Sequence, residues 1–195
     1  LGWPRVRQAQ PNAAHDALAP LQGTRQISGL ITQNVDTLHD QAGSRDVIEL
    51  HGSLHRVLCL DCGQRCERDS IQRLMEAQNP YLAGVDAVQA PDGDTLLDAA
   101  FEARFQVPHC PHCAGERMKP DVVFFGESVP VQRVTSANEL LAASDALLVA
   151  GSSLTVNSGL RLAKMAARSN KPVVIVNIGP TKADDLALAK IEANT

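Results

Sequence analysis

The chain has 195 residues, of which 44% are hydrophobic and 21% are charged, a balance typical of a globular protein with one main domain. Its net charge of -4 and pI near 5.8 argue against a general attraction to nucleic acid, which usually requires a basic patch. No apolar run approaches the roughly 18 residues of a membrane span, and no charged start precedes an apolar signal segment. We therefore expect a cytosolic protein that binds neither nucleic acid nor a membrane.

The first 58 residues predict one short helix and two short strands. Asn12 can cap a helix that runs to about Ala19, where Pro20 ends it. Residues 26–32 and 47–50 are short apolar runs that suit β-strands, and polar residues follow each of them. Because the chain begins at a leucine and enters at once on such patterns, we expect it to be part of a longer protein.

Residues 59–118 differ in character and predict a separate small lobe. They hold two Cys-x-x-Cys pairs, Cys59/Cys62 and Cys110/Cys113, with 47 residues (63 to 109) between the pairs. Each pair can wrap one side of a tetrahedral ion, so the two together supply the four sulfurs of a closed structural zinc site. The interval is much longer than the roughly 15–20 residues of a compact zinc ribbon. Helical spacing at 70–78 and 95–105, around a turn at 91–94, predicts what fills it.

The cysteines also admit other interpretations. Disulfide scaffolds belong mostly to short secreted chains, and a redox motif would need one pair in its own βαβ setting. Cys66 makes the count odd and is either a substitute ligand or, as we favour, a free thiol. His109 and His112 interleave with the second pair and could compete for the metal, but four thiolates need neither.

After residue 118 the pattern becomes regular. Near-continuous apolar runs predict strands buried on both faces, at 122–125, 146–150 and 173–178. Helical patterns lie between them at 134–143 and 159–168, and a further helix is predicted to open at Asp184. The alternation predicts an α/β fold with a parallel sheet and crossover helices, into which the metal lobe is inserted.

Three polar clusters follow predicted strands of this sheet. In doubly wound sheets ligands bind outside the carboxyl ends of the strands. Small residues and amide side chains there suit close contact with ribose hydroxyls and phosphates. Each cluster alone also reads as an ordinary βα turn, but three in one sheet favour a nucleotide site. They are Gln33, Asn34 and Asp36; Gly151, Ser152 and Ser153; and Asn177, Ile178 and Gly179.

His51 follows a predicted strand and precedes the metal lobe. Histidine is the side chain best matched to proton transfer near neutral pH, so His51 is a candidate general base. A histidine with a structural role at a domain junction remains an alternative. For His15 and His39 we expect structural roles.

Several adjoining segments resemble the sirtuins, which are NAD-dependent protein deacylases, in both order and approximate spacing. The segments are 32–39 with 42–44, Glu49-Leu-His-Gly52, the paired Cys-x-x-Cys, Lys119-Pro-Asp-Val-Val-Phe-Phe-Gly-Glu127, Gly151-Ser-Ser-Leu154 and Val176-Asn-Ile-Gly179. The long interval between the cysteine pairs and the Gly-Ser-Ser turn are most similar to the class II group. The resemblance covers nearly the whole chain.

The resemblance implies a Rossmann-like parallel sheet formed by 1–58 and 119–195, with 59–118 as the inserted zinc-binding lobe. It implies a deacylase that releases nicotinamide, 2'-O-acyl-ADP-ribose and free lysine from acyl-lysine proteins or peptides, with His51 as the general base. The implied cofactors are NAD and one structural zinc ion. The implied sites are Gln33, Asn34, Val35, Asp36, Gly151, Ser152, Ser153, Asn177, Ile178 and Gly179 for NAD; Val123, Phe124 and Gly126 for the substrate; and Cys59, Cys62, Cys110 and Cys113 for zinc.

The chain departs from the sirtuin pattern at its start. Sirtuins begin with a strand, a glycine-rich phosphate-binding turn and a cofactor-binding loop, and nothing in residues 1–25 matches these. We therefore expect this chain by itself to bind zinc but to turn over acyl-lysine poorly. The alternatives are a protein ADP-ribosyltransferase, a zinc-ribbon binding module without catalysis, and an inert NAD-binding remnant. A bacterial protein of this kind would be cytoplasmic, and a eukaryotic one would lie in the mitochondrial matrix.

Overall fold

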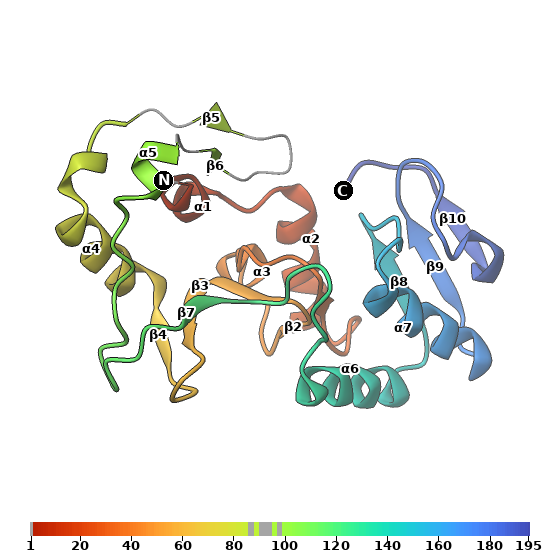
Figure 1. Cartoon of the computed structure of the whole chain (residues 1–195). Helices are drawn as coiled ribbons and strands as arrows, with labels where there is room; N and C mark the ends of the chain where they lie inside the picture. The colour runs from red at the N-terminus through yellow and green to blue at the C-terminus, as the bar shows by residue number, and fades with distance from the viewer. Residues whose placement is uncertain (1, 86–87, 90–94, 97–98) are drawn as a thin grey trace. The chain divides into compact units, whose positions relative to one another are not determined.

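The structure, a computed structural model, describes residues 2–85, 88–89, 95–96 and 99–195 (Figure 1). The chain divides into two compact units. Unit 1 comprises Leu1–Gln10, Val35–Thr37 and Gly52–Val122, and unit 2 comprises Pro11–Asn34, Leu38–His51 and Val123–Thr195. The unit that holds the cysteines is thus larger than 59–118 on both sides, because its central strand begins before the first cysteine pair and another of its strands ends after the second.

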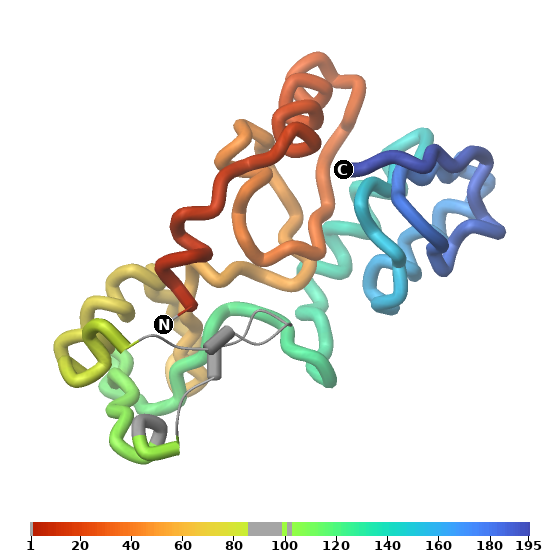
Figure 2. Tube along the Cα trace, turned by 90° about the horizontal axis from the view of Figure 1, so that it is seen from above, coloured from red at the N-terminus to blue at the C-terminus, as the bar shows by residue number. Residues whose placement is uncertain are grey.

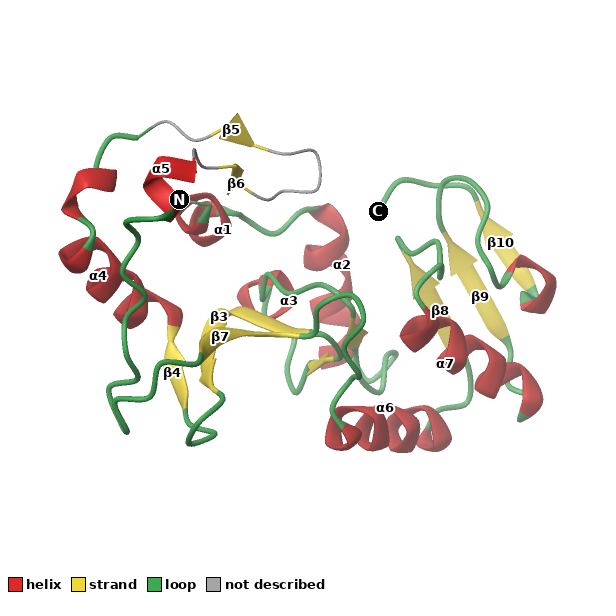
Figure 3. Ribbon diagram, viewed as in Figure 1, coloured by secondary structure: helices red, strands yellow, loops and turns green. Residues whose placement is uncertain are grey.

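Unit 2 contains the predicted parallel sheet. Strands β8 (Leu147–Ala150), β9 (Val173–Val176) and β10 (Ala189–Ile191) lie in the order β10-β9-β8, and both pairs are parallel. Helix α7 (Asn157–Arg168) connects β8 to β9, and helix α6 (Val131–Ala143) precedes β8 (Figure 3). The path from β8 through α7 to β9 can also be followed in Figure 2. The predicted α/β organisation is confirmed.

The core of unit 2 lies between this sheet and its helices. Val173 and Ile175 of β9 are almost completely buried and pack with Leu141 of α6. Helix α7 contributes small side chains to the same cluster, Ala163 and Ala166. Small residues on the helix let it approach the β-branched side chains of the sheet closely, as interior packing densities require.

The first helix of unit 2 begins where the sequence predicts but ends later. Helix α2 (Ala13–Gly23) begins as expected, because the Asn12 side chain accepts from two backbone N–H groups of the first turn. Its predicted end at Pro20 is wrong. Proline lacks only its own N–H and can still accept, and the Pro20 carbonyl receives the N–H of Thr24 in the last turn.

Two short parallel strands follow α2. Strand β1 (Ile31–Thr32) pairs with β2 (Ile48–Glu49), with Ile31 opposite Ile48, and helix α3 (Leu38–Gln41) lies between them in sequence. Only the last two residues of the apolar run 26–32 form a strand.

Unit 1 is built on a three-stranded antiparallel sheet. Strand β3 (Gly52–Cys59) lies between β4 (Arg65–Glu67) and β7 (Met118–Val122). Helix α4 (Arg68–Gln78) covers it with Ile71, which is fully buried against Val57 and Cys66. The remaining elements are α1 (Trp3–Gln8), η1 (Pro80–Leu82), β5 (Val88–Gln89), β6 (Thr95–Leu96) and α5 (Ala99–Glu102).

Three predicted elements of the later chain are wrong. The apolar run 122–125 is not a strand of the parallel sheet, since β7 ends at Val122 and Phe125 is 99% exposed. The helix expected at 95–105 is replaced by β6 and the single turn α5, while residues 97–98 and the expected turn at 91–94 lie outside the described residues. The helix expected from Asp184 is only the 3-10 turn η2 (Asp184–Leu186), because β10 follows it.

None of the helices within the described ranges is long and apolar enough to cross a bilayer.

Candidate cofactor site and metal centre

His51 lies just after β2 and is held at both ring nitrogens. Nδ1 lies 3.1 Å from the backbone carbonyl oxygen of Gln33, and Nε2 lies 2.8 Å from Oγ of Ser158. A carbonyl can only accept, so Nδ1 carries the proton and Nε2 accepts from the serine hydroxyl. The pKa of His51 is lowered, chiefly by burial and also by the charge of Arg133, although the bond to Gln33 opposes this. The imidazole is therefore neutral near pH 7, with Nε2 as its basic atom.

The Gln33 side chain extends this cluster to the end of β8. Its Oε1 accepts from the Ser152 hydroxyl at 3.1 Å, and its Nε2 donates to Ser158 Oγ at 3.4 Å. Gln33, His51, Ser152 and Ser158 thus form one connected polar network within unit 2. It joins the polar residues after β1, the residue after β2 and the first turn of α7.

Ser158 was not anticipated from the sequence. Ser158 is the second residue of α7 and does not lie at a strand end. Its position in the chain gives no indication that it contacts His51. The signal that could have found it is its place in the first turn of a helix that follows a Gly-Ser-Ser turn, because helix N-termini expose backbone N–H groups to ligands.

The Gly151–Ser153 turn is shaped by two positive φ angles. Gly151 has φ +61 and donates its N–H to the Val176 carbonyl, and Leu154 has φ +53 with its N–H bonded to Ser152 Oγ. Ser153 points elsewhere, since its hydroxyl contacts Thr155 and its carbonyl accepts from Lys182. Glycine is required at position 151 because its φ is positive and because a Cβ there would clash with the Thr195 side chain.

A cavity of about 650 Å³ in unit 2 brings together part of the predicted cofactor site. Its walls include residues 29–32, which contain β1, and residues 146–150, which contain β8, and His15 and His39 also line it. Four of the predicted residues line it: Gln33, Asn34, Gly151 and Ser152. Ser153 and the turn 177–179 do not, so the structure separates the predicted set into a cavity group and a second group at the end of β9.

That second group is a polar turn. Asn177 is buried, and its amide nitrogen donates to the carbonyl oxygens of Ile178 (2.8 Å) and Gly179 (3.3 Å). Ile178 is 62% exposed, and Gly179 has φ +77.

The other predicted residues lie near the end of β1. Asn34, in the first group, is exposed, with its N–H bonded to Thr32 Oγ1. Val35 and Asp36 belong to unit 1, where the Val35 carbonyl accepts from Leu54.

The residues predicted to contact a substrate adjoin His51 through the backbone. The N–H of Val123 donates to the His51 carbonyl at 2.9 Å. Phe124, 49% exposed, and Glu127 close a turn on each other through two 3.0 Å bonds, and Gly126 lies in it with φ +88. An exposed aromatic turn therefore begins at the residue that follows Val123, the backbone partner of His51.

The four paired cysteines meet in unit 1. Their Sγ atoms all lie within 4.8 Å of one another; Cys59 and Cys113 are 3.7 Å apart, and Cys62 and Cys110 are 3.8 Å apart. A tetrahedron with zinc–sulfur bonds of about 2.3 Å has edges of about 3.8 Å, so the sulfurs fit zinc. All five cysteines are free thiols, which removes the disulfide interpretation. Cys66 is buried against Val57 and Ile71 and stays outside the set of four, as expected.

The two half-sites have the same backbone geometry. In each, the first cysteine donates its N–H to the residue five positions later, namely Gln64 and Gly115. In each, the residue after the second cysteine donates to the first cysteine's carbonyl, namely Gly63 (φ +74) and Ala114 (φ +59). Backbone N–H groups of His112 and Gly115 also point at sulfurs. Neither His109 nor His112 is among the four metal-ligand candidates.

Comparisons with known proteins agree with this geometry. Residues 3–158 match the sequence model of the Sir2 family. The chain is 61% identical over 193 residues to an NAD-dependent protein deacetylase 3 of Pseudomonas syringae pv. tomato, covering 99% of this chain and 69% of that protein. It is 52% identical over 192 residues to an NAD-dependent protein deacetylase of Xanthomonas campestris pv. campestris, covering 98% and 65%. The chain thus spans about two thirds of the length of these relatives.

Solved structures are also similar to it. A structure described as Sir2 with p53 peptide and NAD+ matches with a TM-score of 0.75 and 32% identity, over 97% of this chain and 68% of the other. One described as Sir2 bound to acetylated peptide matches with a TM-score of 0.76 at the same identity and coverage.

Proposed function

The chain belongs to the Sir2 family, and from that membership we propose that the protein is an NAD-dependent protein-lysine deacylase. It would remove acetyl or related acyl groups from lysine side chains and release nicotinamide, 2'-O-acyl-ADP-ribose and free lysine. The observation that carries the proposal is His51, a half-buried neutral histidine fixed by Gln33 and facing a serine hydroxyl with its basic nitrogen.

His51 is the proposed general base. Its tautomer is set by the bond from Nδ1 to the Gln33 carbonyl, so Nε2 is the atom that accepts a proton from a hydroxyl. Its partner in the structure, the Ser158 hydroxyl, already occupies that position at 2.8 Å and indicates that a hydroxyl group fits there. Since burial lowers the pKa of His51, the base is available below the usual histidine range, and activity should rise with pH through that lowered value.

We propose that the polar groups at the strand ends hold NAD, which supplies the ADP-ribose that accepts the acyl group and the nicotinamide that leaves. The side chains and N–H groups present suit ribose hydroxyls and phosphate oxygens. Gln33 and Asn34 would bind the nicotinamide ribose half, and the turns at 151–153 and 177–179 the adenosine half. Their role in orienting the reacting groups accounts for a site with a single base.

We propose that the four cysteine thiolates hold zinc in a structural role. Four protein ligands complete a tetrahedron and leave no coordination position for water or substrate. We propose that the metal ties Cys59, at the end of β3, to the cysteine pair that precedes β7, and that it takes no part in the reaction.

The acyl-lysine peptide is proposed to bind along Val123, Phe124 and Gly126. The exposed Phe124 ring offers an apolar contact for a peptide, and the segment is tied to His51 because the Val123 N–H is bonded to the His51 carbonyl. The relatives named as deacetylases are bacterial, and we propose a cytoplasmic location. We propose no role in binding nucleic acid or membranes.

The test is to incubate the full-length protein with NAD and an acetyl-lysine peptide and to analyse the products by mass spectrometry. We expect deacetylated peptide and 2'-O-acetyl-ADP-ribose in equal amounts. His51→Ala should abolish both while zinc, measured by atomic absorption, stays bound. His109→Ala, which replaces an exposed histidine of unit 1, is the matched control and should retain turnover.

Two results would contradict this function. ADP-ribose attached to the peptide or to the protein, with the acetyl group left in place, would favour a protein ADP-ribosyltransferase. Near-normal deacetylation by His51→Ala would remove His51 from the role of base.

A further inference from the structure

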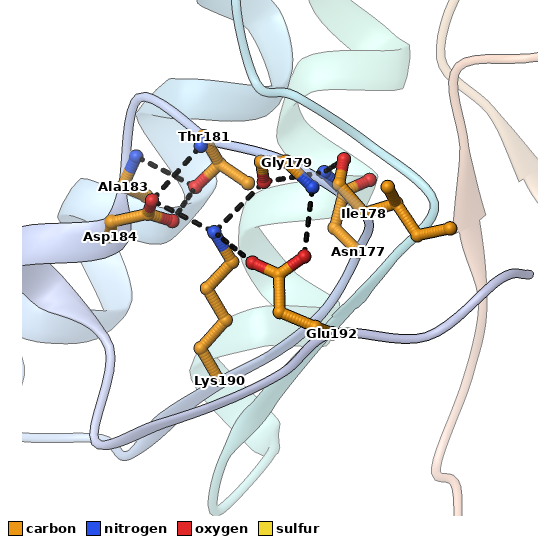
Figure 4. Close-up of polar contacts among 8 residues, drawn as sticks. All are labelled: Asn177, Ile178, Gly179, Thr181, Ala183, Asp184, Lys190 and Glu192. Atoms are coloured by element: carbon orange, nitrogen blue, oxygen red, sulfur yellow. Dashed lines mark hydrogen bonds and ion pairs between the residues drawn. The ribbon is translucent and has the colours of Figure 1, made fainter.

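A charged cluster fastens the turn that follows β9 (Figure 4). The ammonium group of Lys190, from β10, donates to the Gly179 carbonyl at 2.8 Å and to Asp184 Oδ2 at 3.0 Å, and lies 3.2 Å from Glu192 Oε1. An ammonium group has three donors, so these contacts use its full capacity. Lys190 therefore joins the turn, the 3-10 segment after it and the end of β10.

Gly179 is held at both of its backbone polar groups. Its carbonyl accepts from Lys190, and its N–H donates to Glu192 Oε2 at 3.0 Å. The two side chains that hold it are themselves an ion pair. Because Gly179 has φ +77, in the left-handed region, this pair fixes a conformation that other residues adopt only with strain.

The same carbonyl connects the cluster to Asn177. The Asn177 amide nitrogen donates to the carbonyls of Ile178 and Gly179, and the latter is the one that Lys190 contacts. The Asn177 N–H is bonded to the Ile191 carbonyl of β10, so its backbone is fixed as well. With the amide nitrogen engaged by its own turn, the amide oxygen is the atom that remains to accept from a ligand hydroxyl.

The charges of the cluster support one another. Bonds from Thr181 and from Lys190 lower the pKa of Asp184 to about 2, and the bond to Asp184 raises the pKa of Lys190. The Gly179 N–H, together with Lys190, lowers the pKa of Glu192. The cluster stays charged throughout the neutral pH range.

We propose that Lys190 is a positioning residue for the cofactor, which holds the turn 177–179 in the form that receives the adenosine half of NAD. This rests on the proposed function. Lys190 acts through Asn177 and not by touching the reacting atoms. Its side chain keeps 21% of its exposure, and those of Asp184 and Glu192 keep 35% and 61%, so these ion pairs add little to global stability. Their main effect is to order the turn before binding, which spares the ligand that cost.

The experiment compares Lys190→Met with Lys190→Arg in the full-length protein. ADP-ribose affinity is measured by calorimetry, and the KM for NAD, the KM for an acetyl-lysine peptide and kcat are measured by product formation. For Lys190→Met we expect ADP-ribose affinity to fall by about tenfold and the KM for NAD to rise in parallel, with kcat and the peptide KM unchanged. Lys190→Arg should restore most of the affinity. Lys182→Met is the control, because it removes an exposed lysine from the segment between β9 and β10. It should leave the ADP-ribose affinity, both KM values and kcat unchanged.

If Lys190 had a purely structural role, its replacement would leave the affinity for ADP-ribose unchanged. Affinity of Lys190→Met for ADP-ribose within twofold of the wild type would overturn the proposal, and so would a fall in kcat at constant KM for NAD. If Lys190→Met does not fold, Glu192→Gln replaces it; we expect about threefold weaker ADP-ribose binding from the lost ion pair, and unchanged binding would overturn the proposal. A wild type that binds ADP-ribose but does not deacylate peptides contradicts the proposed function alone, since the affinity comparison still decides the role of Lys190.

Discussion

Gly159→Ala tests whether the position of the Gln33 side chain matters to the candidate cofactor site. Gly159 lies in the first turn of α7, and a Cβ there would come within 2.8 Å of Gln33 Oε1 and 3.0 Å of its Cδ and Nε2. Ordinary contacts between such atoms are about 3.5 Å, so the amide must retreat by roughly 0.6 Å. The atoms displaced are the end of a flexible side chain, and the backbone need not move.

The expected change in stability is small because two effects oppose each other. The retreat breaks the bonds of Gln33 to Ser152 (3.1 Å) and Ser158 (3.4 Å), each worth about 1 kcal/mol. Alanine in place of glycine inside a helix stabilises by up to about 1 kcal/mol. The free energy of unfolding should therefore fall by about 1–2 kcal/mol, a Tm change of about 2–8 °C for a chain of this size.

Function should change more than stability. The bond from His51 Nδ1 goes to the backbone carbonyl of Gln33 and survives, so kcat should stay within about twofold, while the KM for NAD should rise about fivefold to tenfold. Gly23→Ala is the matched control, since nothing lies within 4 Å of a Cβ at this helical position and neither KM nor kcat should change. A KM for NAD that is unchanged in Gly159→Ala but raised in Gln33→Ala would refute the steric reasoning, as would a Tm loss above about 10 °C.

Three further predictions concern the core, the metal and the N-terminal helix. Ile175→Ala, at a completely buried position of β9, should lower the free energy of unfolding by about 2–5 kcal/mol in urea titration; a loss below about 1 kcal/mol would contradict its place in the core. Cys62→Ser should lower the zinc content measured by atomic absorption, whereas Cys66→Ala should keep one zinc per chain; loss of zinc from both would bring Cys66 into the metal site. The indole N–H of Trp3 donates to Asp69 Oδ1 at 2.7 Å. This bond is the largest of the effects that lower the pKa of the Asp69 carboxyl. A carboxylate with a lowered folded pKa stabilises above its unfolded pKa of about 3.9, and the stabilisation is lost as the pH falls through the folded value. The fluorescence of Trp3, the single tryptophan of the chain, should therefore change below about pH 4 in the wild type and lose that step in Asp69→Asn, and an identical acid titration in both proteins would disprove the link.

Strands β8 and β9 of unit 2 could be predicted from the sequence because each is a near-continuous apolar run. Val173-Val-Ile-Val176 is apolar at every position, as a strand covered on both faces must be, and β9 occupies these residues. The strand β7 could not be found in this way. Its residues include Lys119, Pro120 and Asp121, and the buried Asp121 is stabilised by Arg56 and Arg65 of neighbouring strands. Pro120 is tolerated because β7 is an edge strand.

The candidate site likewise has residues that the sequence predicts and residues that it does not. Gln33 and Ser152 follow strands, and the rule that ligands bind at strand ends predicted that they belong to one site. His51 was predicted separately, as a histidine between a strand and the metal lobe. Ser158 reaches His51 from a helix 107 residues later in the chain, a pairing that depends on how α7 packs and on no local pattern. The role of Lys190 was equally hidden, because the sequence predicts a helix where β10 lies.

The matched backbone geometry of the two cysteine half-sites has a consequence for the segment between them. Each half-site closes its turn with its own backbone hydrogen bonds, so bound metal would act as a crosslink between two turns and not as the organiser of the 47 residues that separate them. The entropy of closing a flexible loop grows only slowly with its length, by about 0.6 kcal/mol for each doubling. Insertions or deletions in the interval should therefore leave metal affinity nearly unchanged where they spare β4 and α4, whose Cys66 and Ile71 are held in the core of unit 1.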